Sequence, residues 1–396
     1  MAKREYLDTM RQRYNMLTSR KEKTQLLSEI CTTTGYNRKY VLRFLSHGRK
    51  RGRKRTLARR GRKQYYGTEI IKPLKKIWLT ANLPCGKRLK AILSLWLPSY
   101  ESLFGALGDD LRKKILSVSA ATIDRLLRQP RLKHTQRGRC TTKPGGLLRA
   151  QIPIQTGQWQ QERPGFLEAD TVAHCGMSTA GQFASTLDCV DVRTGWSEQR
   201  AVWCKGADGV VTQMRSIEKS LPFELLGFDA DNGSEFINLQ LFKHFYSRQK
   251  KVIFTRSRAY HKNDNAHVEQ KNWTHVRQWI GYERIETPDG VKALNELYTN
   301  EWRLFHNFYC ASVRLLAKTR IGSKRIKKYE DPKTPYQRVL ESKYVSDFQK
   351  NKLTEIFTNT NPFTLRKAME TRLRKLFKII RTQRQQTENS NGYLKK

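Results

Sequence analysis

The feature that most limits the possible folds of this chain is an ordered series of strand-like and helix-like segments that begins at Phe166. Three stretches rich in strand-forming residues come first, at 166–175, 183–192 and 196–204. The last two are joined by the short turn 193–195, which predicts an antiparallel hairpin. Because another strand directly precedes this hairpin, we expect three consecutive antiparallel strands.

After residue 204 the pattern changes to alternating helix and strand. The expected elements are a helix at 209–221, a strand at 224–228, a helix at 235–246, a strand at 251–255 and a helix at 265–280. Such alternation favours parallel strands that are connected by helices. Together the segments predict a mixed five-stranded sheet in an α/β domain of the ribonuclease-H-like class, which we place at 161–338.

The charge balance limits the partners of the protein. The 396 residues include 77 Lys and Arg against 35 Asp and Glu, which gives a formal net charge of +42. A field of this sign favours polyanions, so nucleic acid is the expected partner. The chain is also 38% hydrophobic, which is enough to bury real cores, so it is not simply a disordered basic polymer.

Neither a secretory leader nor a membrane span is expected. The best apolar run, 91–100, stops at Glu101 and is too short to cross a bilayer. The seven cysteines lie far apart and show no zinc-like spacing, so we expect reduced thiols in a cytoplasmic protein.

The first 63 residues show the pattern of a helix-turn-helix unit. Apolar residues at helical spacing come before a Thr-rich turn, and Asn37 is a plausible N-cap for a second helix. That helix would bury Val41, Leu42 and Leu45. Its outward, groove-reading side would carry Arg38, Lys39 and Arg43. The alternative is an ordinary helical hairpin with a solvated basic face.

A run without acidic residues follows, at 47–63. Arg51 and Arg53 flank a glycine and are expected to lie in a minor groove or along phosphates, although a solvated linker would have the same composition.

The segment 64–130 predicts a second helical domain with a second helix-turn-helix. Ser119 is placed to cap a helix that turns Ile123, Leu126 and Leu127 inward. Arg125 and Arg128 would then face outward, toward DNA. Turn-forming residues without periodicity make 131–160 a linker.

Three acidic residues lie where an enzyme that cleaves phosphodiester bonds with metal ions would need carboxylate ligands. Asp170 lies in the first expected strand, Asp231 follows the fourth, and Glu269 lies on the helix at 265–280. Carboxylate oxygens are the ligands that Mg²⁺ prefers.

The sequence Asp231-Asn-Gly-Ser-Glu-Phe236 resembles the middle motif of the retroviral-integrase superfamily, and in particular of the DDE transposases of bacterial insertion sequences. The interval 232–268 is close to the short spacing of that family, and Glu269-x-x-Asn272 is similar to its helix signature. The resemblance covers about 160–340. One departure is Ala259, where relatives usually carry proline before the aromatic residue.

The resemblance implies a transposase that cleaves 3′ ends of an insertion sequence and transfers the strands into target DNA. It implies Asp170, Asp231 and Glu269 as catalytic ligands of two Mg²⁺ ions, with Mn²⁺ as a possible substitute. It also implies double-stranded DNA as the substrate, at least a dimer on DNA, and a place near the nucleoid of a prokaryotic cell. The expected helix at 265–280 also carries Lys271, Asn272, His275 and Arg277, which could donate hydrogen bonds to DNA phosphates.

Other carboxylates compete for the same roles. Glu168 and Asp229 share strand faces with Asp170 and Asp231 by the two-residue period. Asp188 and Asp191 flank the hairpin turn and are expected to bond amides of the turn or the neighbouring strand.

The segment 339–396 is expected to be a basic helical tail. Leu365, Met369, Leu373, Leu376, Phe377 and Ile380 form one apolar stripe among many Lys and Arg residues. This helix would dock on the catalytic core, pair with another subunit or lie on an anionic membrane. Residues from Thr382 onward are expected to fray.

Two other functions fit parts of the sequence. One is a domesticated DNA-binding regulator that keeps its helix-turn-helix modules and an idle integrase core. The other is a nuclease or resolvase of the ribonuclease-H type, which would nick DNA but not join strands.

Overall fold

The computed structural model describes residues 3–46, 65–132, 162–204, 206–231, 233–257, 265–321 and 323–393. The chain divides into two compact units, Met1–Tyr65 and Tyr66–Lys396. The expected segments 64–130, 161–338 and 339–396 therefore all fall in the second unit, apart from residues 64 and 65. The expected linker and the basic run with Arg51 and Arg53 lie almost wholly outside the described residues.

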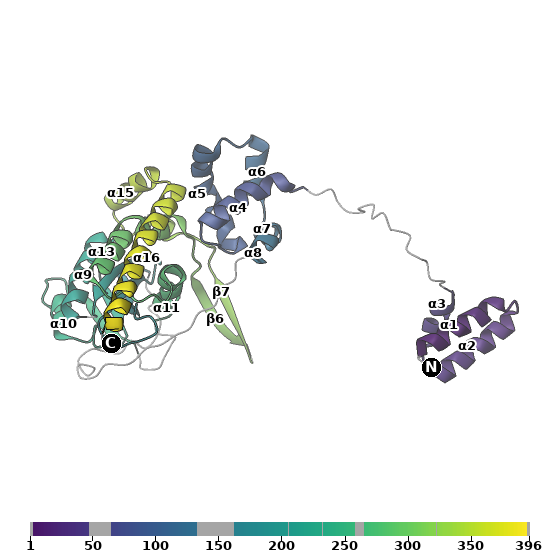
Figure 1. Ribbon diagram of the computed structural model, residues 1–396. Coiled ribbons are helices and arrows are strands. Elements are labelled where there is room, and N and C mark those ends of the chain that lie inside the picture. The colour runs from purple at the N-terminus through teal and green to yellow at the C-terminus, as the bar shows by residue number, and fades with distance from the viewer. Residues whose placement is uncertain are drawn as a thin grey trace. The chain divides into compact units, whose positions relative to one another are not determined.

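The first unit consists of α1 (Lys3–Met16), α2 (Arg20–Thr34) and α3 (Arg38–Ser46) (Figure 1). Its core is formed by Leu7, Leu26, Leu27, Ile30, Val41 and Leu45. Helix α2 ends at Gly35, whose φ of 72° suits a residue without a side chain. The Asn37 side chain accepts a hydrogen bond from Lys39 N at 2.9 Å, so the expected N-cap of α3 is present.

One inward residue of α3 was wrongly assigned by the sequence pattern. Leu42 is 43% exposed, whereas Val41 and Leu45 are buried. Residues four apart lie on the same side of a helix, and Leu42 is turned about 100° from Val41. Arg38, Lys39 and Arg43 are exposed, as expected.

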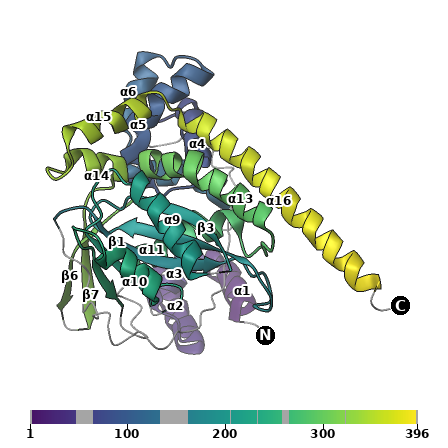
Figure 2. The same ribbon diagram turned by 90° about the vertical axis from the view of Figure 1, so that its left-hand side faces the viewer.

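The second unit is built on a five-stranded sheet with the order β3-β2-β1-β4-β5 (Figure 2). The strands are β1 (Phe166–Ala173), β2 (Ala184–Asp191), β3 (Ser197–Trp203), β4 (Gly227–Ala230) and β5 (Ile253–Arg256). The first three are antiparallel neighbours, and β4 and β5 continue the sheet parallel to β1. The mixed five-stranded sheet expected from the sequence is confirmed.

Helices cover this sheet in the expected alternation. They are α9 (Ala207–Ser220), α10 (Leu239–Tyr246), α11 (Ala266–Lys271) with its continuations η3 (Asn272–Arg277) and α12 (Gln278–Ile280), α13 (Pro288–Leu297), η4 (Tyr298–Trp302) and η5 (Phe305–Tyr309). Helices α9 and α13 pack on β3, while α11 packs on β1 and β2. The chain therefore brings the start of α11 next to the strand that carries Asp170.

The helices of the segment 64–130 share the core of the sheet. They are η1 (Thr68–Ile70), α4 (Ile71–Thr80), α5 (Gly86–Phe104), α6 (Asp109–Ser117), α7 (Ala120–Leu126) and α8 (Arg128–Leu132). Trp96 of α5 donates its indole N–H to Tyr309 O at 3.1 Å and packs edge-on against Phe305 and Phe363. A single core therefore joins these helices to the sheet and to the tail.

The expected cap and faces of α7 are present. The Ser119 hydroxyl accepts from Thr122 N at 3.2 Å. Ile123 and Leu127 are fully buried, Leu126 is partly buried, and Arg125 and Arg128 are exposed.

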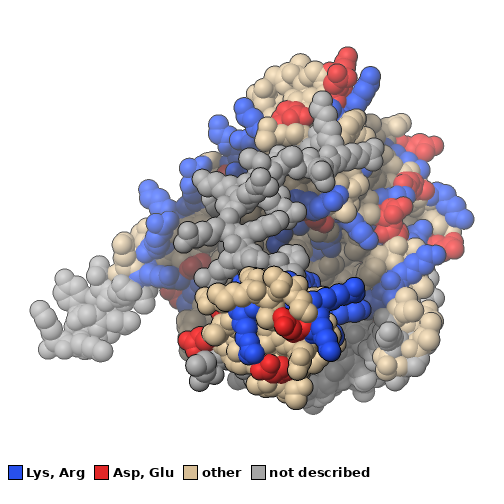
Figure 3. All heavy atoms as spheres, turned by 90° about the vertical axis from the view of Figure 1, so that its right-hand side faces the viewer, with Lys and Arg blue, Asp and Glu red and all other residues tan. Residues whose placement is uncertain are grey.

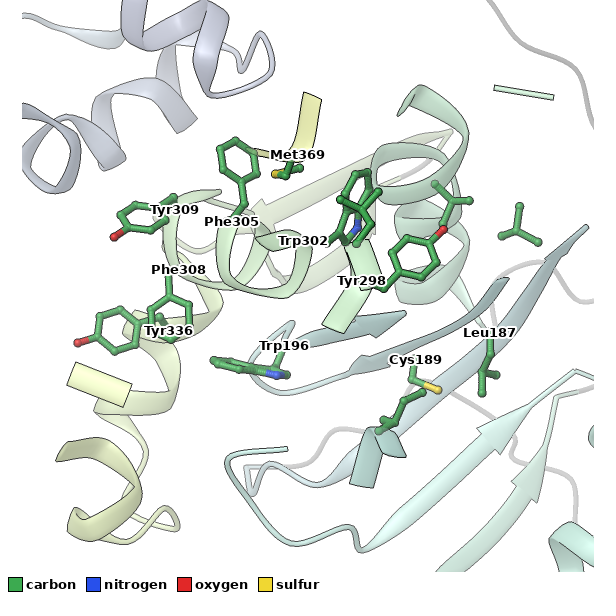
Figure 4. Close-up of a cluster of buried hydrophobic side chains, with 14 of the residues drawn as sticks. Leu187, Cys189, Trp196, Tyr298, Trp302, Phe305, Phe308, Tyr309, Tyr336 and Met369 are labelled. Carbon is green, nitrogen blue, oxygen red and sulfur yellow. The ribbon is translucent and has the colours of Figure 1, made fainter. Parts of the chain in front are cut away.

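Beyond the sheet, the structure contains two strands that the sequence pattern did not indicate, β6 (Leu315–Ile321) and β7 (Lys324–Tyr329). Three helices follow, α14 (Pro335–Glu341), α15 (Asp347–Thr358) and α16 (Pro362–Tyr393). Helix α16 packs on α13, and its Met369 lies in the same buried cluster as Trp302 and Phe305 (Figure 4). Of the three roles considered for the tail, docking on the core is the one observed.

The expectation that the tail frays from Thr382 is wrong, because α16 continues to Tyr393. Gln383 of this last part is buried and donates to the Thr287 hydroxyl. In the described part of the chain, no helix has both the length and the apolar character needed to cross a membrane.

Candidate active site

Asp170 on β1 and Asp231, directly after β4, come together because β1 and β4 are neighbouring inner strands of the sheet. The parallel register pairs Ala169 of β1 with Ala230 of β4, so each aspartate takes the next position on its chain. The Oδ1 atom of Asp170 accepts from Thr171 N at 2.7 Å, and its Oδ2 accepts from Asn272 Nδ2 at 2.6 Å. Burial and the neighbouring negative charge of Asp231 raise the pKa of Asp170 to about 7. Burial and the repulsion from Asp231 therefore both oppose ionisation of Asp170.

Contacts within the fold explain several residues of the motif 231–236, which follows β4. Asp231 Oδ1 accepts from Gly233 N at 2.9 Å, which closes a tight turn. A side chain at Gly233 would meet the Glu235 carboxylate at 2.5 Å and Asp231 Oδ1 at 2.9 Å, so a larger residue there would displace one or both carboxylates. Glu235 in turn accepts from the Thr171 hydroxyl at 2.7 Å, which ties the turn to β1. Asn232 lies outside the described residues, as do residues 258–264 with Ala259.

Glu269 lies on α11, the helix that contacts the strand of Asp170. It is exposed and precedes Asn272 by three residues, so the two lie on the same side of the helix. Asn272 is the residue that touches Asp170. However, no three His, Cys, Asp or Glu side chains among the described residues are gathered closely enough to hold a metal ion. The structure thus brings two of the acids together and places the third on the helix that packs on the strand of Asp170.

Glu168, the neighbour of Asp170 on the same strand face, holds the first turn of α11. Its Oε2 accepts from His267 N at 2.9 Å and from Val268 N at 3.2 Å, and its Oε1 meets His267 Nδ1 at 2.7 Å. Burial alone would lower the pKa of His267, but the hydrogen bond and charge of Glu168 outweigh it, and the pKa is raised. A carboxylate at a helix N-terminus satisfies amides that would otherwise lack partners.

The other competing acids have structural partners. Asp229 accepts from the Thr255 hydroxyl at 2.5 Å. Asp191 accepts from Gly165 N at 2.8 Å and from Thr194 N at 2.7 Å, which confirms its expected role at the turn.

Asp188 lies directly opposite Asp170 in the β1–β2 register, a position that the sequence reasoning missed. It is fully buried, and its carboxylate accepts from Gln199 Nε2 on β3 at 2.8 Å instead of from a backbone amide. Burial raises its pKa to about 7, although Gln199 and Lys271 act in the opposite direction. The strand period gives the faces of β1 and β2, but only their register shows which residues are opposite.

Lys271 is buried, which corrects its assignment as an exposed phosphate contact. Burial lowers its pKa to about 8, partly offset by the charge of Asp188. Its Nζ lies 3.2 Å from His275 Nε2, and the His275 ring stacks on His306 with centroids 4.0 Å apart. Burial keeps the pKa of both histidines well below its ordinary value, so the two imidazole rings carry little positive charge near neutral pH.

Arg277, another expected phosphate contact, makes bonds within the fold. Its guanidinium donates to Ala173 O at 2.8 Å and to Gly281 O at 3.2 Å, and it lies 4.6 Å from the ring centroid of Tyr282. Arg277 therefore supports the end of β1.

The donor set suits a divalent ion with oxygen ligands. Two carboxylates lie side by side with a raised pKa at Asp170. The buried Oδ1 of Asn272 has no hydrogen-bond partner among the described residues. A hard cation prefers such oxygen atoms and would offset the repulsion between the acids.

Comparisons with known proteins give one relative in sequence and distant likenesses in structure. No family model matches the chain. The uncharacterized protein y4rM of Sinorhizobium fredii (strain NBRC 101917 / NGR234) is 36% identical over 340 residues, which cover 84% of this chain and 94% of y4rM.

Two solved structures show weaker similarity. The catalytic core domain of BIV integrase is 16% identical, with 45% of this chain and 95% of that chain covered and a TM-score of 0.29. A chain of the simian T-cell lymphotropic virus intasome in complex with PP2A regulatory subunit B56 gamma is 12% identical, with 61% and 73% covered and a TM-score of 0.30. Likenesses at this level do not identify a function.

Proposed function

The chain belongs to the same protein family as y4rM of Sinorhizobium fredii, and we propose that it is a DDE-type DNA transposase with a ribonuclease-H-like catalytic domain. The observation that carries the proposal is the pair Asp170 and Asp231, two adjacent carboxylates on neighbouring inner strands of a mixed sheet, with a pKa of about 7 at Asp170. The strand order, with three antiparallel strands followed by two parallel ones, supports the proposed fold class.

The proposed ligands are Asp170, Asp231 and Glu269. Two bound Mg²⁺ ions would supply activation of the attacking oxygen and stabilisation of the leaving oxygen in an in-line displacement at phosphorus. Asn272 holds one oxygen of Asp170 through its amide N–H, which fixes the rotation of that carboxylate. Glu168 fixes the start of α11, and Gly233 permits the turn that presents Asp231. No covalent bond between enzyme and DNA is needed.

The substrate in this proposal is double-stranded DNA, first the element end and then the target. Exposed Arg38, Lys39 and Arg43 on α3, and Arg125 and Arg128 on α7 and α8, are the proposed DNA contacts. Lys and Arg are also spread over the face drawn in Figure 3, with fewer acids among them. Because two ends must be held together for transposition, we propose at least a dimer on DNA.

The decisive test compares Asp231→Asn and Glu269→Gln with the unaltered chain in Mg²⁺-dependent cleavage and joining of DNA ends. Both variants should lose cleaved and joined products while still binding DNA. Asp347→Asn and Glu355→Gln, exposed acids of α15, serve as matched controls and should keep activity. Full activity in either site variant would remove the assigned residue from the mechanism. Nicks without joined products would favour a nuclease or resolvase.

A second candidate is a DNA-binding regulator with an inactive integrase core. It is favoured by one observation, that the three acids are not gathered as a metal-holding group in the described residues. This alternative predicts site-specific DNA binding without cleavage under any divalent ion, so the same assay separates the two functions.

A further inference from the structure

The β6–β7 hairpin is a ribbon of two strands, and no third described strand extends it. Figure 1 shows it projecting from the body of the second unit. Leu316, Ile321 and Ile326 are each at least half exposed, and Tyr329 is 48% exposed. A two-stranded hairpin without a covered face is marginally stable in water by itself. Such a ribbon is expected to gain stability from a partner.

The charge of the ribbon indicates the chemistry of that partner. Between Leu315 and Tyr329 the chain has Lys or Arg at 318, 320, 324, 325, 327 and 328 and no acidic residue. The register sets Lys318 opposite Lys327 and Arg320 opposite Arg325. A polyanion would balance these six basic residues, whereas a second copy of the same ribbon would add like charge to them.

The positive surface continues from the base of the ribbon into the body. Lys327 and Lys328 line a cavity of about 1030 Å³, together with Lys87 and Arg88 of α5. Gln270 of α11, the residue after Glu269, forms part of the same wall. Glu330 and Asp331 also border the cavity. A chain of phosphates along this path would run from the ribbon toward the candidate active site.

We propose that the β6–β7 ribbon is a DNA-binding arm, which lies in a groove of duplex DNA and guides the phosphate backbone into the cavity beside α11. The major groove of B-DNA is wide enough for a two-stranded ribbon. Binding of phosphates by Lys and Arg releases counterions and so supplies affinity without sequence preference. The inference rests on the proposed function only in taking DNA as the partner.

The test measures DNA binding by the full chain in EDTA, so that no reaction is required. The double variant Lys327→Gln, Lys328→Gln is compared with Lys352→Gln, Lys367→Gln, which removes the same charge from exposed positions on α15 and α16. Binding of a labelled duplex without specific ends is followed over a range of salt. The slope of log K against log salt should become shallower by about 0.9 for each phosphate that the variant no longer neutralises, and by about 1.8 for the pair of lysines. The control variant should keep the original slope.

An unchanged slope in the ribbon variant would overturn the proposal. Light scattering supplies a second outcome, because loss of an oligomer with unaltered DNA binding would make the ribbon a subunit contact instead. The Asp231→Asn chain, measured in parallel, separates this proposal from the catalytic one. If the Asp231→Asn chain kept its activity, the assigned active site would be contradicted. The salt dependence of DNA binding would still test the ribbon independently.

Discussion

Asp170 is the residue at which folding and chemistry conflict. Its pKa is raised from 3.8 to about 7, first by burial and then by the charge of Asp231. Two hydrogen bonds, from Thr171 N and Asn272 Nδ2, favour the ionised form but do not overcome these effects. The folded protein therefore stabilises the ionised form of Asp170 poorly at neutral pH. A strongly shifted carboxyl of this kind is expected at a site that accepts a cation.

This conflict predicts how stability depends on pH when divalent ions are removed. Between about pH 4 and about pH 7 the folded state holds a proton on Asp170 that the unfolded chain has released. Stability should therefore fall as pH rises through this window, by at most about 1.4 kcal/mol per pH unit from this residue. Asp170→Asn should flatten that part of the curve, measured as the unfolding midpoint in EDTA. A variant whose curve follows that of the unaltered chain would contradict the raised pKa.

At the scale of elements, α11 depends on the carboxylate that holds its first turn. The first amides of a helix have no acceptor inside the helix, so α11 needs an outside acceptor at its start. Glu168 accepts from two of its first amides and from the His267 ring. The position of Glu269 and Asn272 relative to Asp170 follows from this attachment.

Glu168→Gln is expected to weaken the attachment while leaving the size of the side chain unchanged. We expect a loss of about 1 kcal/mol of stability, as for other helix caps, together with slower strand transfer. The charge that raises the pKa of His267 would also be lost, so that pKa should fall. Denaturant unfolding and an NMR titration of the histidines measure the two effects. If the pKa of His267 stayed raised in the variant, Glu168 would not be its controlling partner.

Some secondary-structure elements could be predicted from the sequence, and others could not. The sheet and its helices follow from the hydrophobic periodicity of the sequence, and the turn at Gly233 follows from a motif in which a larger residue would displace the neighbouring carboxylates. The β6–β7 ribbon was missed because its strands mix basic and apolar residues without a two-residue alternation, and none of its described side chains is buried. Asp188 was not placed beside Asp170 because that contact depends on strand register, which the period alone does not give. The burial of Lys271 likewise depends on how α11 packs on β2.

At the scale of the whole molecule, the described residues form two separate hydrophobic cores. One lies in α1–α3, and the other extends from α4 through the sheet to α16. The sequence predicted a separate helical domain at 64–130, but Trp96 connects these helices to Tyr309 and Phe363. Elements that share a core are expected to unfold together.

Two matched substitutions test this division. Ile30 of α2 and Ile77 of α4 are both fully buried, and each loses the same atoms when changed to alanine. Each change should cost about 2–5 kcal/mol in the unit that contains it. In calorimetry, Ile30→Ala should lower only the smaller transition, because its core does not include the sheet. Ile77→Ala should lower the larger transition as a whole, since α4 lies in the core that contains Trp302 and Met369. A third transition that appears only with Ile77→Ala would mean that α4–α8 unfold independently, and the second helical region would then be a domain of its own.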